Sequence, residues 1–128
     1  MGGTFLGTNS KGYISADKII KGFNQLGLDA LIGIGGDGSM KILQTLTKKG
    51  NINFVGIPKT IDNDLVKTDN CPGFGSVAKY IATSAKEASL DIKSMCKTST
   101  KVFVLEVMGR HAGWIAASAE LANDENNT

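Results

Sequence analysis

Apolar residues follow two different spacings along the chain, and these spacings predict helices and strands in alternation. The first helix is predicted after Ser15, a residue that can cap a helix, and before Gly27, which can end one. Its apolar positions fall at helical spacing: Ile19, Ile20, Phe23 and Leu26. Residues 30–34 then form a short apolar run closed by glycines, which is typical of a strand buried on both faces.

The same alternation continues along the rest of the chain. The further elements expected are a helix from about residue 39 to 48, a strand at 53–57, a polar loop to about Gly75, a helix at 76–95, a strand at 101–107 and a helix at 113–122. This order predicts an α/β fold, a parallel sheet with helices on both faces. We expect residues 1–122, opening with a loop over 1–14, to form the central part of one domain, and 123–128 to form a polar tail.

The sheet is expected to be incomplete at both ends. The predicted order opens on a loop and a helix, closes on a helix, and supplies three strands, which is few for a sheet in a domain.

Composition and charge exclude several classes of protein. Of the 128 residues, 41% are hydrophobic and 20% are charged, as in globular rather than disordered chains. The 14 basic and 12 acidic side chains are scattered and give a net charge of +2, so we expect neither nucleic acid nor a membrane as a partner.

No apolar run of membrane-spanning length and no signal pattern are present, so we expect a cytoplasmic protein. Cys71 and Cys96 are expected to be free thiols, and the single histidine, His111, excludes a multi-histidine metal site.

A glycine-rich segment between a predicted strand and a predicted helix is the first candidate for chemistry. In residues 33–39 (GIGGDGS), glycines let the backbone approach an anion, and the start of the next helix attracts phosphate. The segment fits G-x-G-x-x-G, but Pro58 and Lys59 stand where a dinucleotide fold has an acidic residue about 20 positions later, which disfavours a nicotinamide cofactor. Asp37 would repel phosphate unless a cation lay between them, which indicates Mg²⁺. A tight turn without a ligand is the alternative.

Polar segments also follow the next two predicted strands. In residues 58–64 (PKTIDND), Asp62 and Asp64 can divide two roles, one accepting a hydroxyl proton and the other holding a charge, with Lys59 beside them. Arg110 can make a bidentate contact with a phosphate, whereas His111 is expected to be packed or on the surface. The alternatives are a solvated turn for 58–64 and an ion pair for Arg110. Because ligands bind at the carboxyl ends of parallel strands, we expect these segments to meet.

The strings GGDGS at 35–39, PKTIDND at 58–64 and MGR at 108–110, in this order, closely resemble those of the 6-phosphofructokinases. The resemblance covers about residues 2–122. It implies an enzyme that transfers a phosphoryl group to the 1-hydroxyl of fructose 6-phosphate, giving fructose 1,6-bisphosphate in glycolysis. It also implies in-line transfer helped by positioning and charge neutralisation, and a homo-oligomer for the full-length parent.

The same resemblance implies a role for each matching residue. On the donor side, Gly36, Gly38 and Ser39 would surround the donor phosphates and Asp37 would hold Mg²⁺. On the substrate side, Asp62 would be the general base that takes the proton from the 1-hydroxyl. The other residues that it implies for catalysis or substrate binding are Lys59, Thr60, Asp64, Met108, Gly109 and Arg110.

Different residues indicate different phosphoryl donors. Gly38 leaves room for a nucleotide α-phosphate where pyrophosphate-dependent members of the family commonly carry Asp. Lys59 and the stretch 68–76 resemble the pyrophosphate-dependent subgroup instead. We expect ATP, because residue 38 acts directly on the space for the donor; a pyrophosphate-dependent fructose-6-phosphate phosphotransferase is the alternative.

The family's first strand, its donor loop and its second half, which grips the sugar phosphate, have no counterpart in these residues. We therefore expect the isolated chain to be nearly inactive. A non-catalytic remnant that only binds phosphate or full-length subunits is the remaining alternative.

Overall fold

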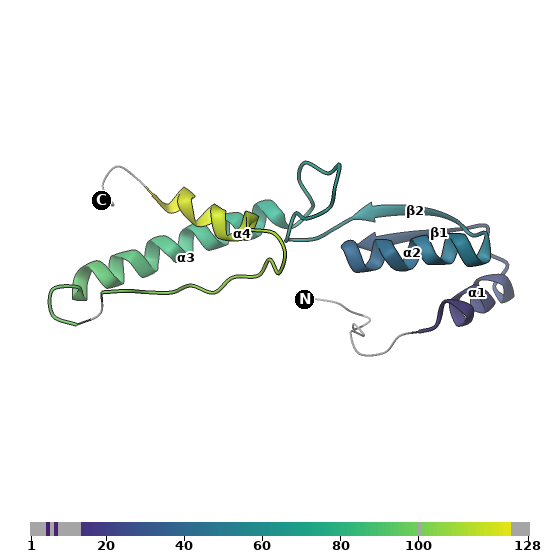
Figure 1. Cartoon of the computed structure of the whole chain (residues 1–128), viewed down its shortest axis with the longest axis horizontal. Helices are drawn as coiled ribbons and strands as arrows, with labels where there is room; N and C mark the ends of the chain where they lie inside the picture. The colour runs from purple at the N-terminus through teal and green to yellow at the C-terminus, as the bar shows by residue number, and fades with distance from the viewer. Residues whose placement is uncertain (1–4, 6, 8–13, 100, 124–128) are drawn as a thin grey trace.

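The computed structural model of the chain describes residues 5, 7, 14–99 and 101–123. Most of the expected loop over 1–14 and of the expected tail over 123–128 therefore lies outside the described residues. The elements are α1 (Ala16–Gln25), β1 (Ala30–Gly35), α2 (Asp37–Gly50), β2 (Asn53–Pro58), α3 (Phe74–Met95), α4 (Trp114–Ala117) and a 3₁₀ helix, η1 (Ser118–Ala122). They form two units (Figure 1): α1, β1, α2 and β2 at one end of an elongated molecule, and α3, α4 and η1 at the other.

The first unit is a parallel strand–helix–strand arrangement. β1 and β2 pair in parallel, in a register that runs from Ala30 opposite Asn53 to Gly35 opposite Pro58. Parallel strands cannot be joined by a tight turn, and α2 provides the crossover between them. The predicted strand, helix and strand are confirmed here, with helix α2 beginning at Asp37.

Two glycines let α2 lie directly on the sheet. Gly33 and Gly56 are opposite each other in the ladder. A Cβ at Gly33 would overlap the Leu43 side chain, and one at Gly56 would lie 2.8 Å from the Met40 Sδ atom. The helix therefore fills the space left by the two missing side chains, and Leu43 is buried there.

Helix α1 packs on α2, on the side away from the strands. It begins as predicted, because the Ser15 Oγ atom accepts a hydrogen bond from the Lys18 N–H at 3.4 Å. It ends before Gly27, whose φ of 62° lies in the left-handed region that glycine adopts without strain. The α1 side chain Ile20 lies against Gly50, the last residue of α2, where a Cβ would come within 2.8 Å of it.

Only one face of the sheet is covered by a described helix. Helix α2 contacts both strands, and no other described helix contacts them. The opposite face carries aliphatic side chains that are largely exposed: Ile32, Ile34, Val55 and Ile57. The parallel sheet with helices is confirmed, and among the described residues its second face has no helical cover.

The predicted strand at 101–107 is wrong. These residues run extended beside α3 (Figure 1), but they pair with no strand among the described residues. Phe103, Leu105 and Val107 line an apolar cleft of about 290 Å³ against α3. Val102 and Val104 point away from it and are 74% and 83% exposed. The residues alternate as in a strand, yet a ladder also needs a neighbouring strand, and the described part of the chain places none alongside.

The single helix predicted at 113–122 is also wrong in its second half. Residues Trp114–Ala117 are α-helical, but Ser118–Ala122 tighten into a 3₁₀ helix. The Ser118 hydroxyl donates to the Ile115 carbonyl at 2.6 Å, an interaction three residues back that suits the tighter turn. Ile115, 1% exposed, and Ser118, 7% exposed, are buried in this unit, where α4 and η1 pack on α3.

Two further expectations concern the chain as a whole. Both cysteines are free thiols, as predicted, with Cys71 buried and Cys96 partly exposed. None of the described helices is both long enough and apolar enough to cross a membrane.

Substitution at the glycine pair tests the packing of α2. Gly33→Ala should lower the free energy of unfolding by about 1–3 kcal/mol, because the added Cβ overlaps Leu43 in a filled space. Gly22→Ala in α1 is the control, because a Cβ there meets nothing within 4 Å, and it should raise stability by about 0.5–1 kcal/mol. Urea denaturation measures both changes. Equal stability of wild type and Gly33→Ala would contradict this packing.

Candidate functional site

The carboxyl ends of β1 and β2 bring two of the polar segments into contact. Beyond Pro58, which has no N–H, the Lys59 N–H donates to the Gly35 carbonyl at 2.9 Å and extends the ladder by one bond. The chain then passes the β1–α2 turn so closely that a Cβ at Gly36 would lie 3.4 Å from the Thr60 Cβ atom. The glycine turn and the segment after β2 are therefore direct neighbours.

A cleft of about 710 Å³ lies where these segments meet the end of the extended segment beside α3. Its lining residues are Gly36, Asp37, Gly38, Thr60, Asp62, Asp64, Glu106, Val107, Met108, Gly109, Arg110 and His111. The structure thus brings together all three polar segments singled out in the sequence. Of the predicted site residues, all except Ser39 and Lys59 line this cleft.

Ser39 and Lys59 lie beside the cleft. The Ser39 side chain is packed over Gly35, where a Cβ would overlap it. Lys59 contributes its main-chain N–H to the strand ladder, and its side chain is exposed. Either side chain would have to turn towards the cleft to contact a ligand in it.

Asp62 contributes to the cleft a carboxylate oxygen that needs a hydrogen-bond or cation partner. Its main-chain N–H donates to the Thr60 Oγ1 atom at 3.2 Å, which fixes the local turn. Its Oδ1 atom is buried and has no hydrogen-bond partner among the described residues. A buried acceptor left without a partner costs free energy, so this oxygen suits a ligand that brings a hydroxyl donor or a cation.

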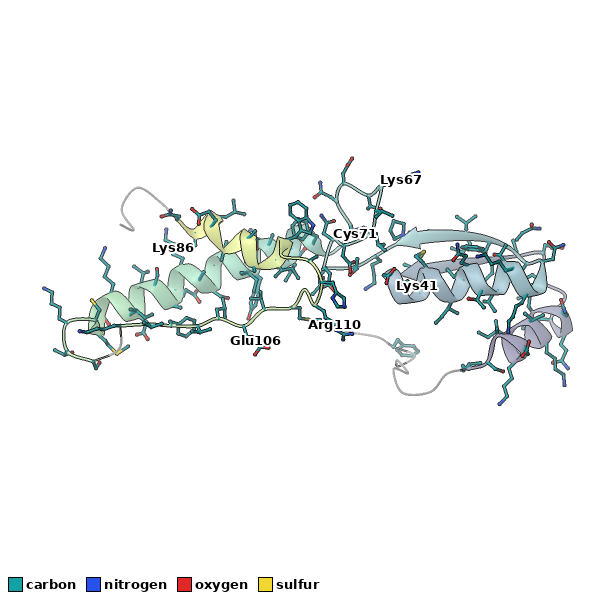
Figure 2. All side chains as sticks on the ribbon, in the orientation of Figure 1. Lys41, Lys67, Cys71, Lys86, Glu106 and Arg110 are labelled. Carbon is teal, nitrogen blue, oxygen red and sulfur yellow. The ribbon has the colours of Figure 1, made fainter. Side chains whose placement is uncertain are left out.

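Asp37 stands at the start of α2 and is paired within that helix. The Lys41 Nζ atom, one turn later, lies 2.7 Å from the Asp37 Oδ2 atom. The hydrogen bond from Lys41 to Asp37, and then the charge of Asp37, raise the pKa of Lys41 above its ordinary value; the charge of Asp64 raises it further, while desolvation opposes the shift. Lys41 therefore remains a cation at neutral pH, next to the carboxylate that the sequence assigns to the metal (Figure 2).

The residues present fit a Mg²⁺ ion bound together with phosphates. No cluster of three or more His, Cys, Asp or Glu side chains suited to a metal occurs in the described part of the chain. Mg²⁺ is usually held by one or two carboxylates, several waters and substrate phosphates, not by an all-protein cage. Asp37, which lines the cleft at the start of α2, can supply that carboxylate.

The polar segment that follows residue 107 turns sharply at Gly109, before Arg110. Gly109 has a φ of 116°, and a Cβ there would lie 2.5 Å from the Ala112 carbonyl oxygen, so no other residue fits without strain. The turn leaves Arg110 exposed at the end of the extended segment, on the side of the first unit (Figure 2).

Three lining residues were not assigned to the site from the sequence: Glu106, Val107 and His111. Glu106 is a single charge inside the otherwise apolar run 102–107, and this isolated charge is the sequence feature that indicates a site residue. His111 was expected to be packed or on the surface; it is exposed, and it also lines the cleft. Nothing in its spacing pointed to the cleft.

The fold and the cleft define a parallel α/β protein whose polar residues gather at the carboxyl ends of its strands. The family described as Phosphofructokinase matches residues 1–127 of the chain. The chain therefore belongs to the phosphofructokinase family.

Relatives with two different donors in their names resemble the chain. A pyrophosphate–fructose 6-phosphate 1-phosphotransferase from Halomonas elongata is 66% identical over 70% of the chain and 22% of the relative. An ATP-dependent 6-phosphofructokinase 1 from Synechocystis sp. is 50% identical over 93% of the chain and 35% of the relative. The crystal structure of a pyrophosphate-dependent phosphofructokinase from Marinobacter aquaeolei covers 86% of the chain at 53% identity and a TM-score of 0.75, over 29% of its own length. The chain thus spans about a third or less of these relatives.

Substitution at Gly109 tests the turn that places Arg110. Gly109→Ala should destabilise residues 108–112 by about 1–3 kcal/mol, because of the positive φ and the Ala112 carbonyl oxygen. Amide hydrogen exchange over this segment should accelerate accordingly. Gly113→Ala is the matched control, because a Cβ there meets nothing within 4 Å. In this variant, amide exchange over residues 108–112 should stay at the wild-type rate. The same exchange in both variants would contradict the described turn.

Proposed function

We propose that the complete gene product that includes these 128 residues is a cytoplasmic phosphotransferase of glycolysis. It transfers a phosphoryl group to the 1-hydroxyl of fructose 6-phosphate and yields fructose 1,6-bisphosphate. The observation that carries the proposal is the buried, unpartnered Oδ1 atom of Asp62 in a cleft shared with Asp37 and Arg110. An acceptor in that position suits a substrate hydroxyl that must lose a proton.

Each lining group has a part in this reaction. Asp62 accepts the proton of the 1-hydroxyl as general base, and Thr60 holds the turn that positions it. Asp64 supports Asp62 with a second negative charge on the same loop. Arg110, at the turn set by Gly109 and next to Met108, contacts the anionic substrate.

The donor binds at the glycine turn. The main chain at Gly36 and Gly38, at the start of α2, faces the donor phosphates, and Ser39 and Lys59 supply further contacts when their side chains turn towards the cleft. Asp37 would hold Mg²⁺. When bound, the ion neutralises charge on the donor phosphates and on the group in transfer.

We propose ATP as the donor. A Cβ at Gly38 would meet nothing within 4 Å, so space is open at the residue that faces the donor. Pyrophosphate is the second candidate, because relatives named as pyrophosphate-dependent reach 66% identity. The 128 residues alone should give little turnover, because they span 22–35% of these relatives.

A donor comparison on the complete gene product tests the function. With Mg²⁺ and fructose 6-phosphate present, we expect product from ATP and none from pyrophosphate. Asp62→Asn should lower kcat by about 10²–10⁴-fold, because it removes the general base. Asp91→Asn, at an exposed carboxylate on α3, is the matched control and should keep wild-type activity. Product from pyrophosphate alone would reverse the donor assignment, and no product from either donor would leave the non-catalytic remnant.

Removal of Lys41 tests the competition for Asp37. Lys41→Met should bind a divalent cation a few-fold more tightly, because the ammonium group no longer occupies the carboxylate. Titration with Mn²⁺, followed by the electron paramagnetic resonance of the free ion, measures this directly. Lys48→Met, near the other end of α2, is the control with the same loss of charge. Equal affinity in the two variants would show that the pair does not compete with the metal.

A further inference from the structure

Asn63 lies in the sequence between Asp62 and Asp64, two of the carboxylates that line the cleft, and its own side chain makes its hydrogen bonds outside the cleft. Asp62 and Asp64 line the cleft, whereas Asn63 is absent from its described lining. The Asn63 Nδ2 atom donates to the Asp69 carbonyl at 3.1 Å, and its Oδ1 atom accepts from the Cys71 N–H at 2.8 Å. The carboxamide thus ties the residue to two main-chain groups, six and eight positions further on.

The backbone at this position is also specified. Asn63 has a φ of 51°, in the left-handed region that asparagine adopts more readily than most residues with a side chain. The conformation turns the chain sharply between Asp62 and Asp64. One residue therefore supplies both the turn and the two hydrogen bonds that close the loop of residues 64–70.

A buried thiol lies at the point where the loop closes and can report on its opening. The main-chain N–H of Cys71 is the group held by the Asn63 carboxamide, and Cys71 is 2% exposed. Cys96, the other cysteine, lies just beyond α3 and is partly exposed. The chain thus contains a protected thiol at the loop and a reference thiol at a distant point of the sequence.

We propose that Asn63 is a positioning residue, whose carboxamide clamps the loop of residues 64–70 and thereby fixes Asp62 and Asp64 in the cleft. The proposal rests on the proposed function for its catalytic consequence. Thr60 holds Asp62 from the preceding side through the 3.2 Å bond to its N–H, and Asn63 holds it from the following side. Without the clamp, the carboxylates keep their chemistry and lose their fixed direction.

The first arm of the test measures the clamp itself, with no assay of activity. Asn63→Gly keeps access to a positive φ and loses both hydrogen bonds; Asn63→Ala loses both and adds backbone strain. In the complete gene product, a thiol reagent followed by peptide mass spectrometry reports the labelling of each cysteine. We expect Cys71 to react at least about ten times faster in both variants, because a fixed hydrogen-bonded loop then opens locally. Cys96 should react at the wild-type rate.

Asn51→Ala is the matched control for backbone strain. Asn51, at the C-terminal end of α2, also has a positive φ, of 48°, and lies outside the loop. Its substitution should leave the labelling of Cys71 unchanged. Faster labelling of Cys71 in Asn63→Ala but not in Asn63→Gly would overturn the clamp, because the strain alone would then account for it. Rapid labelling of Cys71 in the wild type would overturn it as well.

The second arm measures positioning. For both Asn63 variants, kcat with fructose 6-phosphate should fall about 10²-fold, as expected for small misplacement of a catalytic group, while the KM for the donor stays within a factor of about two. Faster labelling of Cys71 together with an unchanged kcat would overturn the positioning role. A wild-type protein without turnover from either donor would instead refute the proposed function and the positioning role with it. The labelling arm would then still decide whether the clamp exists.

Discussion

The parallel register of β1 and β2 is the constraint on which the site depends. Because Gly35 lies opposite Pro58, the turn into α2 and the chain leaving β2 emerge at the same edge of the sheet. Parallel pairing requires a crossover, which α2 provides, and α2 lies close to the sheet because Gly33 and Gly56 face it without side chains. A packing feature in the middle of the sheet therefore determines which polar residues meet at its end.

The second unit reaches the site through loops and not through packed elements. Among the described elements, α3, α4 and η1 contact one another, and none of them contacts β1 or β2. The relative positions of Asp62, Asp64 and Arg110 consequently depend on short turns held at special backbone conformations. Asn63 and Gly109 both have positive φ values, and each occupies a position where most other residues would be strained. In this cleft, restricted backbone conformations in loops, and not core packing, fix the positions of the side chains.

The sequence predicted most of the helices and strands and the meeting of the three polar segments, but not which extended segment lacks a partner strand or which side chains link the loops. The helices and strands up to residue 95 were found, because their apolar spacing and caps, such as Ser15 at α1, are encoded within each segment. The strand at 101–107 failed because Val102 and Val104 alternate correctly but lack a neighbouring strand to pair with. For the site, the three polar segments and most of their residues were identified from chemistry. The hydrogen bonds of Asn63 were not, because a link across six or eight loop residues has no periodic signature.

Overall sequence similarity to relatives does not identify the phosphoryl donor. The two relatives reported above, one named for pyrophosphate and one for ATP, are 66% and 50% identical to the chain, so the choice is argued from individual side chains. Lys59 resembles the pyrophosphate-dependent subgroup, but its positive charge suits either donor. Its side chain also lies outside the cleft and would have to move to act there. Gly38 lines the cleft, and a Cβ in its place would extend into space that is open within 4 Å. Steric exclusion falls off within one or two bond lengths, whereas the attraction of an exposed lysine extends further but is weakened by water and salt. We therefore base the proposal of ATP on residue 38.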